Sequence, residues 1–150
     1  MRVGRCRESK AAHMSYTNTQ LVEVRDCRDE HKGVFARAKI RKDELIGFFD
    51  GKAVIVDLDR KDEFDAFWWR QSLHLKLDGS KLLCLLPQWE PDGVDFLNHS
   101  CRPTARVEEK LYVYADRDID AGEEITVDYR TFNLVPEGIR CWCPEGQCVI

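Results

Sequence analysis

The sequence predicts a single, mostly β domain with one short helical insertion. Short runs rich in β-branched or aromatic residues recur along the chain, and Gly, Asp or Lys bounds most of them. The strict alternation of 73–77, followed by Asp78-Gly79, predicts a hairpin into 81–86. We expect a second strand pair between 111–115 and 125–129. The other predicted strands are 21–24, 34–36, 45–49 and 54–56.

One segment has helical rather than strand periodicity. Within residues 62–71, Phe64, Phe67 and Trp68 recur at the spacing of one helix face. We expect part of the aromatic set around them to join a core and one exposed ring to face a substrate. The loops are long, and long loops in a compact domain usually carry function.

Length and composition indicate one globular domain without a membrane segment. The chain has 150 residues, of which 43% are hydrophobic and 33% charged, and a domain of this size buries enough surface to fold alone. Its longest apolar run, 82–86, is far shorter than the roughly 20 residues of a membrane helix. The net charge of −4 argues against tight non-specific binding to nucleic acid, which requires many cationic groups.

The first residues and the cysteines predict an intracellular protein. Residues 1–18 are polar and largely basic without an apolar stretch, so we expect a flexible leader rather than a secretory signal. The 7 cysteines are an odd number, and without an export signal they favour a reducing compartment. The expected location is the cytoplasm, or the nucleus if the source is a eukaryote.

Three cysteines crowd the end of the chain in the pattern C-x-C-x4-C. Cys141, Cys143 and Cys148 can wrap one face of a zinc ion, which takes four tetrahedral ligands and favours thiolate sulfur. The fourth ligand must come from elsewhere, and the motif around Cys101 makes it the candidate. The alternative is an accidental cluster at a frayed end, but apolar packing does not explain three cysteines among Pro, Glu and Gly.

A second polar cluster follows an apolar stretch in the middle of the chain. Asn98-His99-Ser100-Cys101 places four ligand-capable side chains in succession. The planar groups of Asn and His suit the polar edge of a cofactor. The alternative is an ordinary loop in which Asn98 caps a turn and His99 packs as a buried histidine; the other motifs favour the first interpretation.

Four motifs together resemble the SET-domain family of protein-lysine methyltransferases with a post-SET zinc segment. In order, they are Lys-Gly-Val-Phe-Ala at 32–36, Asn-His-Ser-Cys at 98–101, Gly-Glu-Glu-Ile-Thr-Val-Asp-Tyr at 122–129 and the cysteines of 141–148. The resemblance implies small curved β-sheets and a pseudoknot-like C-terminus, in which the Asn-His segment lies beside the segment around Tyr129. It also implies a SET domain over 19–135 and a post-SET zinc-binding segment over 136–150, after the leader 1–18.

The resemblance further implies roles for individual residues. Tyr129 would be the catalytic tyrosine, and Trp142 would lie against the adenine of S-adenosylmethionine as a lid. Cys101 would complete one structural zinc site with Cys141, Cys143 and Cys148. The residues implied in cofactor binding are His31, Lys32, Gly33, Val34, Asn98, His99, Tyr129 and Trp142. Those implied in the substrate channel are Phe49, Val127 and Phe132.

The sequence departs from the family pattern around the implied site. His31 stands where the family usually has the first glycine of Gly-x-Gly, Phe49 where it has the tyrosine of Tyr-x-Gly, and Val127 where Phe or Tyr is frequent. The loss of channel hydroxyls removes hydrogen bonds that restrain the amine. We expect this to widen the tolerance for higher methylation states.

The function implied is transfer of a methyl group from S-adenosylmethionine to a lysine side-chain amine of a protein, either a histone or another basic protein. The expected partner is therefore a basic, lysine-containing protein or peptide, with neither a membrane nor direct nucleic-acid binding. Two other functions stay open. One is a catalytically silent SET-like module that binds cofactor or peptide, and the other is a small zinc-stabilised interaction domain without a cofactor.

Overall fold

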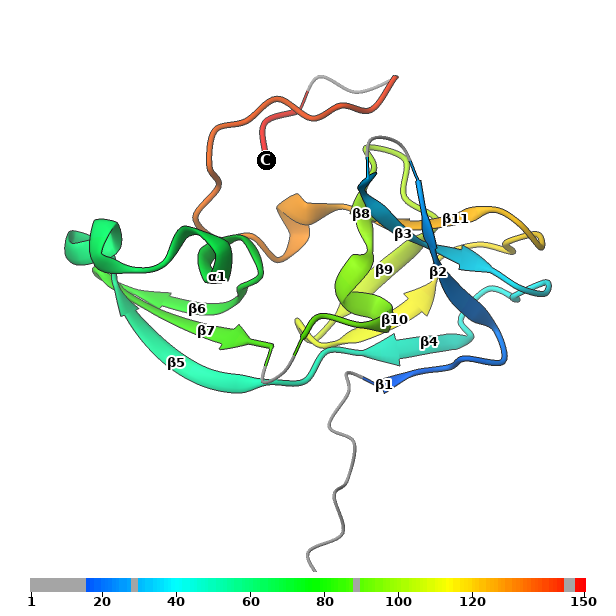
Figure 1. The fold of residues 1–150 in the computed structure, drawn as a ribbon, viewed down its shortest axis with the longest axis horizontal. Helices are drawn as coiled ribbons and strands as arrows, with labels where there is room; N and C mark the ends of the chain where they lie inside the picture. The colour runs from blue at the N-terminus through cyan, green and yellow to red at the C-terminus, as the bar shows by residue number, and fades with distance from the viewer. Residues whose placement is uncertain (1–15, 28–29, 88–89, 145–147) are drawn as a thin grey trace, which may run out of the picture.

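The computed structural model describes residues 16–27, 30–87, 90–144 and 148–150, and its named strands form three small sheets (Figure 1). The first sheet, in the order β1-β4-β10-β9, contains Tyr16–Thr17, Leu45–Phe48, Tyr112–Ala115 and Ala105–Glu108. The second, in the order β2-β3-β11-β8, contains Val22–Asp26, Lys32–Ala36, Glu124–Val127 and Asn98–His99. The third, in the order β5-β7-β6, contains Lys52–Asp57, Lys81–Leu86 and Leu73–Asp78. The predicted architecture, mostly β and divided among small sheets, is confirmed.

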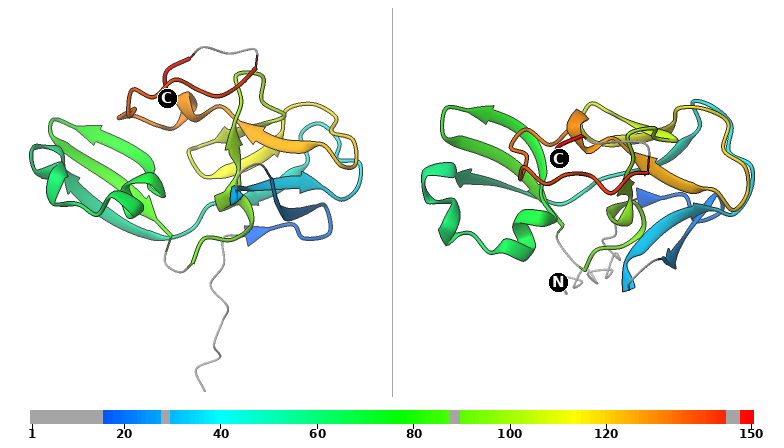
Figure 2. Two further views of the ribbon diagram at one scale, coloured as in Figure 1. Left: turned by 45° about the horizontal axis from the view of Figure 1, so that its top comes forward. Right: turned by 90° about the horizontal axis from the view of Figure 1, so that it is seen from above.

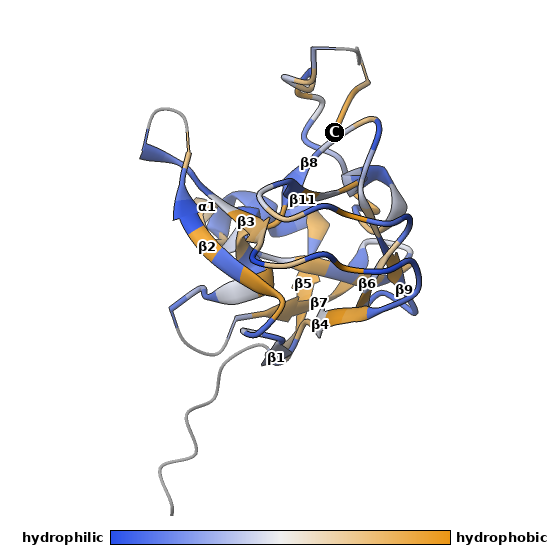
Figure 3. Cartoon of the chain, turned by 90° about the vertical axis from the view of Figure 1, so that its right-hand side faces the viewer, coloured by the Kyte–Doolittle hydropathy of each residue, from blue (hydrophilic) through white to orange (hydrophobic). Residues whose placement is uncertain are grey.

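Two separate hydrophobic cores stabilise these sheets. The larger core draws buried side chains from the first and second sheets, among them Ile46, Val113 and Ile125. The smaller core includes Trp69 and Leu82 and belongs to the third sheet and its helix, which we call the insertion lobe (residues 52–86). Figure 2 shows this lobe beside the rest of the domain. In Figure 3 the hydrophobic residues are concentrated in the strands and the connecting loops are mostly hydrophilic.

The first predicted hairpin is confirmed and the second is wrong. Strands β6 and β7 pair antiparallel around Gly79, whose φ of +55° favours glycine. Strand β10 instead pairs with β4 and β9, and β11 pairs with β3 and β8. Between them the chain is diverted by a bridge from Ile119 to Ile40. The alternating pattern of both strands therefore reports burial against one core, which is shared by two sheets.

The predicted helix is shorter than expected, and a different residue is buried. Helix α1 covers Ala66–Arg70, and the side chain of Asp65 caps it by accepting from the amides of Phe67 and Trp68. A 3₁₀ helix, η2 (Leu58–Glu63), precedes it. Phe67 and Trp68 are exposed, whereas Trp69 is only 6% exposed. A helix of one turn does not establish a periodic face, so Trp69 packs inward instead.

The structure describes only the end of the predicted leader. Residues 1–15 of the expected leader lie outside the described residues, whereas Tyr16–Thr17 forms β1 beside β4. Among the residues that the structure describes, no helix has the length and apolar character needed to cross a membrane.

Candidate active site and metal centre

A short parallel strand pair brings the two central motifs together. In β8 and β11, Asn98 pairs with Thr126 and His99 with Val127, and the amide of Ser100 donates to the carbonyl of Val127 at 3.0 Å. Because β11 ends two residues before Tyr129, this pairing fixes the polar cluster of 98–101 beside the tyrosine. The neighbourhood expected of these segments is confirmed.

Tyr129 is held by three separate contacts. Its hydroxyl donates to the carbonyl of Leu97 at 2.7 Å, and its amide donates to Nδ1 of His99 at 3.1 Å. Its ring packs against Phe132 with 5.6 Å between centroids. Burial, with a smaller contribution from the charge of Glu124, raises the pKa of Tyr129 to about 12. The phenol is therefore neutral near pH 7 and can orient a polar group without carrying a charge.

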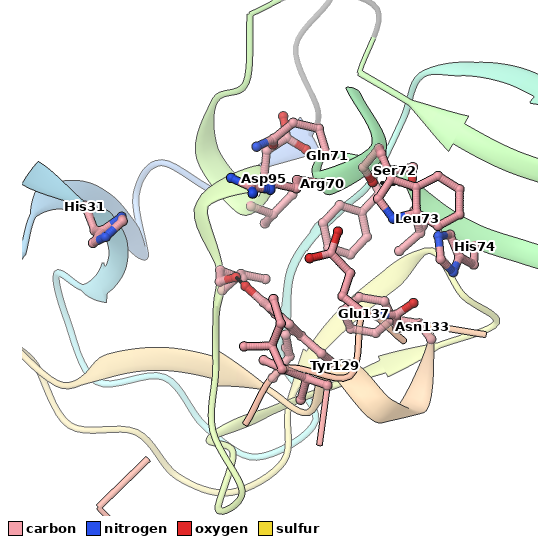
Figure 4. A pocket seen from close by; sticks show the side chains of 18 of the residues that line it. His31, Arg70, Gln71, Ser72, Leu73, His74, Asp95, Tyr129, Asn133 and Glu137 are labelled. Atoms are coloured by element: carbon pink, nitrogen blue, oxygen red, sulfur yellow. Dashed lines mark hydrogen bonds between the residues drawn. The ribbon is translucent and has the colours of Figure 1, made fainter. Parts of the chain in front are cut away.

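A cavity of about 510 Å³ opens beside Tyr129 (Figure 4). The three residues expected in the substrate channel line it: Phe49, Val127 and Phe132. Three residues expected at the cofactor, His31, Tyr129 and Trp142, line it as well. The insertion lobe contributes the opposite wall with residues 69–74. The cavity is thus lined by three parts of the chain: the part that forms the larger core, the insertion lobe and the C-terminal segment. We define the C-terminal segment as residues 134–144 and 148–150.

The other residues expected at the cofactor do not line the cavity. Nδ2 of Asn98 donates to Oε1 of Glu124 at 2.8 Å and to the carbonyl of Lys32 at 3.1 Å. A Cβ on Gly33 would lie only 2.8 Å from the same Glu124 oxygen, so glycine allows this close approach. Val34 is fully buried in the larger core. Only its backbone is available to a ligand.

The substitution of His31 for a glycine is compatible with the local backbone. Among the described residues of this loop, Glu30 has a positive φ of 65°, whereas His31 does not have a positive φ. A side chain at His31 therefore causes no backbone strain. The departure of the sequence from Gly-x-Gly does not by itself distort the loop.

Sulfur and nitrogen atoms of residues 99–101 and of the C-terminal segment lie close together. Ligand atoms of His99, Cys101, Cys141 and Cys148 all lie within 4.8 Å of one another. Sγ of Cys101 is 3.5 Å from Sγ of Cys141 and 3.3 Å from Sγ of Cys148. Cys143 lies beside them, where its Sγ accepts from the amide of Cys101 at 3.3 Å. Sulfur ligands placed about 2.3 Å from one tetrahedral ion are roughly 3.8 Å apart, so Sγ of Cys101 lies slightly closer to the sulfurs of Cys141 and Cys148 than such ligands do, and the sulfurs would move apart to bind one ion.

The hydrogen bonds of His99 define its role in this cluster. Its Nδ1 accepts from the Tyr129 amide, so the neutral ring carries its proton on Nε2. Burial lowers the pKa of His99, Asp128 opposes this shift and Arg130 adds to it, and the ring therefore stays neutral near pH 7. Nε2 then donates toward Sγ of Cys148 at 3.2 Å. A protonated Nε2 has no lone pair for a metal ion.

A family model for the SET domain matches residues 31–130, about two thirds of the chain. The chain belongs to the SET-domain family. This match covers most of the larger core, the insertion lobe and Tyr129, and it ends before the three terminal cysteines.

Proteins named histone-lysine N-methyltransferases are similar to this SET domain. ASHR3 of Arabidopsis thaliana is 40% identical over 143 residues, which cover 84% of this chain and 27% of the relative. Set-2 of Caenorhabditis elegans is 28% identical over 131 residues, covering 77% of this chain and 8% of the relative. An H3 lysine-36 specific enzyme of Saccharomyces cerevisiae is 25% identical over 146 residues, covering 89% and 20%. The chain thus spans about a quarter or less of the length of these relatives.

Several residues at the SET-domain cavity carry no signal in the sequence. The acceptor for the Tyr129 hydroxyl is the carbonyl of Leu97, a backbone group that any residue type would supply. Glu124, the partner of Asn98, lies inside the third motif but has no predicted role. The wall from Trp69 to His74 was signalled only by its aromatic residues.

Proposed function

We propose that this SET domain transfers a methyl group from S-adenosylmethionine to a lysine side-chain amine of a protein. The observation that carries the proposal is that the β8–β11 pairing holds the 98–101 motif beside Tyr129, which lines the cavity. The cysteine cluster joins Cys101 of the same motif to the C-terminal segment, whose Trp142 also lines the cavity. The similarity to histone-lysine N-methyltransferases supports the same activity. Because the chain spans a small part of those relatives, a histone substrate is part of this proposal.

We assign two binding sites to the residues that the motifs bring together. We assign S-adenosylmethionine to the backbone of 31–34, the side chains of Asn98 and His99, and the neighbouring Tyr129 and Trp142. The polar groups of Asn98 suit the edge of this cofactor, and Trp142, which is 62% exposed, offers a ring that can cover the adenine. We assign zinc to Cys101, Cys141, Cys148 and Cys143, with His99 as a donor to Cys148 rather than a ligand. Four thiolates leave no open coordination position, so the ion would be structural.

The protein's own task in this reaction is alignment. When bound, S-adenosylmethionine would supply a methyl group on a cationic sulfur. The neutral amine nitrogen would bond to the methyl carbon as the carbon–sulfur bond breaks, so that S-adenosylhomocysteine leaves and the methylated amine releases a proton to solvent. The lysine amine has a pKa of about 10.4 in water, and an apolar channel disfavours its charged form. Phe49, Val127 and Phe132 provide such a lining. The oxygen of the neutral Tyr129 hydroxyl, whose proton is donated to Leu97, can accept from the amine and orient it.

The proposed substrate channel has Phe49 and Val127 where the family often has tyrosine, and we expect this to favour higher methylation states. Val127 and Phe49 line the cavity and carry no polar group, so they do not restrain a methylated amine. We expect wild type to form di- or trimethyllysine, and Val127→Tyr or the smaller change Phe49→Tyr to shift the product toward monomethyllysine. Mass spectrometry of a lysine peptide measures this, with the exposed Val149→Tyr as a control. A wild-type product that is monomethyllysine only, unchanged by Val127→Tyr, would refute the prediction.

Incubation with labelled S-adenosylmethionine and a mixture of histones and other basic proteins tests the activity itself. Transfer of label to lysine is expected for wild type. No transfer above the level of Tyr129→Phe, with retained cofactor binding by calorimetry, would favour the silent module. Absence of cofactor binding would favour the zinc-stabilised interaction domain.

The proposed reaction leads to a proposed partner and place of action. A lysine-containing protein or peptide, basic around its target, is the proposed substrate, and neither a membrane nor nucleic acid is needed for the reaction. The reduced cysteine cluster favours an intracellular compartment, the cytoplasm or a eukaryotic nucleus.

A further inference from the structure

His74 connects the insertion lobe to the start of the C-terminal segment. It lies on β6 and is only 3% exposed. Its Nδ1 accepts two backbone hydrogen bonds, from Leu134 at 3.1 Å and from Val135 at 3.2 Å. The imidazole ring also packs against the ring of Trp69, with 5.2 Å between the two centroids. A single imidazole nitrogen therefore binds two successive amides of the segment that leads to the cysteines.

This junction lies between the two parts of the cavity wall that the C-terminal end of the chain supplies. Before it, Phe132 and Asn133 line the cavity, and the amide of Asn133 donates to the carbonyl of Tyr129 at 2.8 Å. After it, Trp142 lines the cavity. Val135 also packs against the smaller core. In Figure 1 the chain passes α1 here before it rises to the C-terminus, and Figure 4 shows His74 at the edge of the cavity.

We propose that His74 is a positioning residue for methyl transfer, because it fixes the C-terminal segment to the insertion lobe and so holds the cavity wall that runs from Tyr129 to Trp142. This inference rests on the proposed function for its catalytic consequence. The attachment itself is a structural property and is tested separately. His74 lines the cavity wall opposite Tyr129, and we assign its effect to the segment that it holds.

Protonation of His74 would break the attachment. An imidazolium carries a proton on Nδ1, so it cannot accept from Leu134 or Val135. The charged groups that act on the ring are two cations, Lys61 from η2 and Lys110 from the β9–β10 turn, while Glu137 lines the same cavity.

The pH range follows from the surroundings of His74. Burial, with the two lysines, lowers the pKa of His74 from 6.5 to about 4. Between these values the unfolded chain binds more protons than the folded chain, so the attachment is complete above pH 6.5 and weakens as the pH falls toward 4.

Two variants separate the acceptor from the shape of the side chain. His74→Phe keeps a ring against Trp69 but offers no acceptor. His74→Asn offers an amide oxygen that accepts hydrogen bonds and does not titrate. Hydrogen exchange of the Leu134 and Val135 amides, measured by NMR at pH 7 and pH 5, reports the attachment without any catalysis. We expect protection in wild type and His74→Asn at pH 7, faster exchange in His74→Phe, and a smaller protection factor at pH 5 than at pH 7 in wild type only.

Kinetics then test the positioning role. In His74→Phe the partly buried amides of Leu134 and Val135 lose their acceptor, and an unpaired buried donor shifts the equilibrium between attached and detached segment by about tenfold. We therefore expect kcat/KM for a lysine peptide to fall about tenfold in this variant. His74→Asn should restore most of it and flatten the acid side of the pH profile relative to wild type, with zinc content unchanged in all three. Equal exchange in wild type and His74→Phe would overturn the inference, and so would an acid-induced loss of protection in His74→Asn.

The outcomes also separate this inference from the proposed function. If wild type transfers no methyl group, the proposed function fails, and exchange still decides whether His74 holds the segment. If wild type is active and His74→Phe has the same kcat/KM, the positioning role fails and the proposed function stands. Should His74→Phe not fold, the acid response of His74→Asn decides the question.

Discussion

Tyr129→Phe is expected to reduce methyl transfer by about 100-fold or more, because misplacing a reacting group by about 1 Å already costs that much. The variant removes one oxygen, whose proton is donated to the carbonyl of Leu97 at 2.7 Å. Burial keeps the pKa of this phenol at about 12, so a neutral hydroxyl is lost and no charge changes. Single-turnover rates with a lysine peptide and labelled S-adenosylmethionine measure the effect.

The control for this variant is a second tyrosine outside the cavity. Tyr112 lies on β10 and is 37% exposed, and Tyr112→Phe removes the same atom without touching the site. We expect it to retain the wild-type rate. Calorimetry should give unchanged cofactor affinity for Tyr129→Phe. A rate within about twofold of wild type in Tyr129→Phe would exclude a catalytic role for this residue.

Loss of zinc is expected to have the second large effect. Binding of a structural zinc contributes about 10–16 kcal/mol in zinc-finger peptides at neutral pH, and here it would hold Cys101 to the C-terminal segment. We expect one zinc per chain in wild type, and little or none in Cys101→Ser. Because Trp142 lies between two of the proposed ligands, methyl transfer should be lost together with the metal. Elemental analysis and activity after chelation measure both effects.

Cys27→Ser is the matched control for the zinc variants. Cys27 is a free cysteine near Asn98, with Sγ 3.9 Å from its Nδ2, and it is outside the cluster. Its replacement should leave one zinc per chain. Full zinc occupancy in Cys101→Ser would contradict the proposed ligand set.

Two further variants identify the fourth zinc ligand. The hydrogen bond from the Tyr129 amide to Nδ1 makes His99 a donor to Cys148. Loss of a residue that only orients a ligand lowers metal affinity by about 10- to 100-fold. We therefore expect His99→Gln to weaken zinc binding within that range and Cys143→Ser to weaken it further. A larger loss in His99→Gln than in Cys143→Ser would identify the histidine as the ligand.

The sequence predicted the site best where the residue types of one motif indicate what they bind or contact. The crowding of Cys141 and Cys148 predicted a metal cluster, and the structure brings both to Cys101. The motif of 98–101 predicted closeness to Tyr129, and the β8–β11 pairing provides it. The roles of these residues in binding and catalysis stay predictions until the variants above are measured.

Pairing partners and backbone contacts could not be predicted in the same way. Alternation in β10 and β11 reports which side chains are buried, but burial in a shared core does not say which strand is the neighbour. The two-residue strand β8 has no local pattern at all. His74 follows a predicted strand pattern as a polar residue, yet it is buried because two amides of a segment 60 residues away bind its ring. Such contacts depend on the assembled fold.

A crystal structure with S-adenosylhomocysteine and a lysine peptide tests the central claim most directly, namely that one cavity receives both reactants beside Tyr129. We expect the cofactor product against Asn98 and Trp142, and the lysine chain between Phe49 and Phe132 with its nitrogen facing the sulfur. Cofactor product bound away from this cavity, or a lysine that does not reach Tyr129, would contradict it.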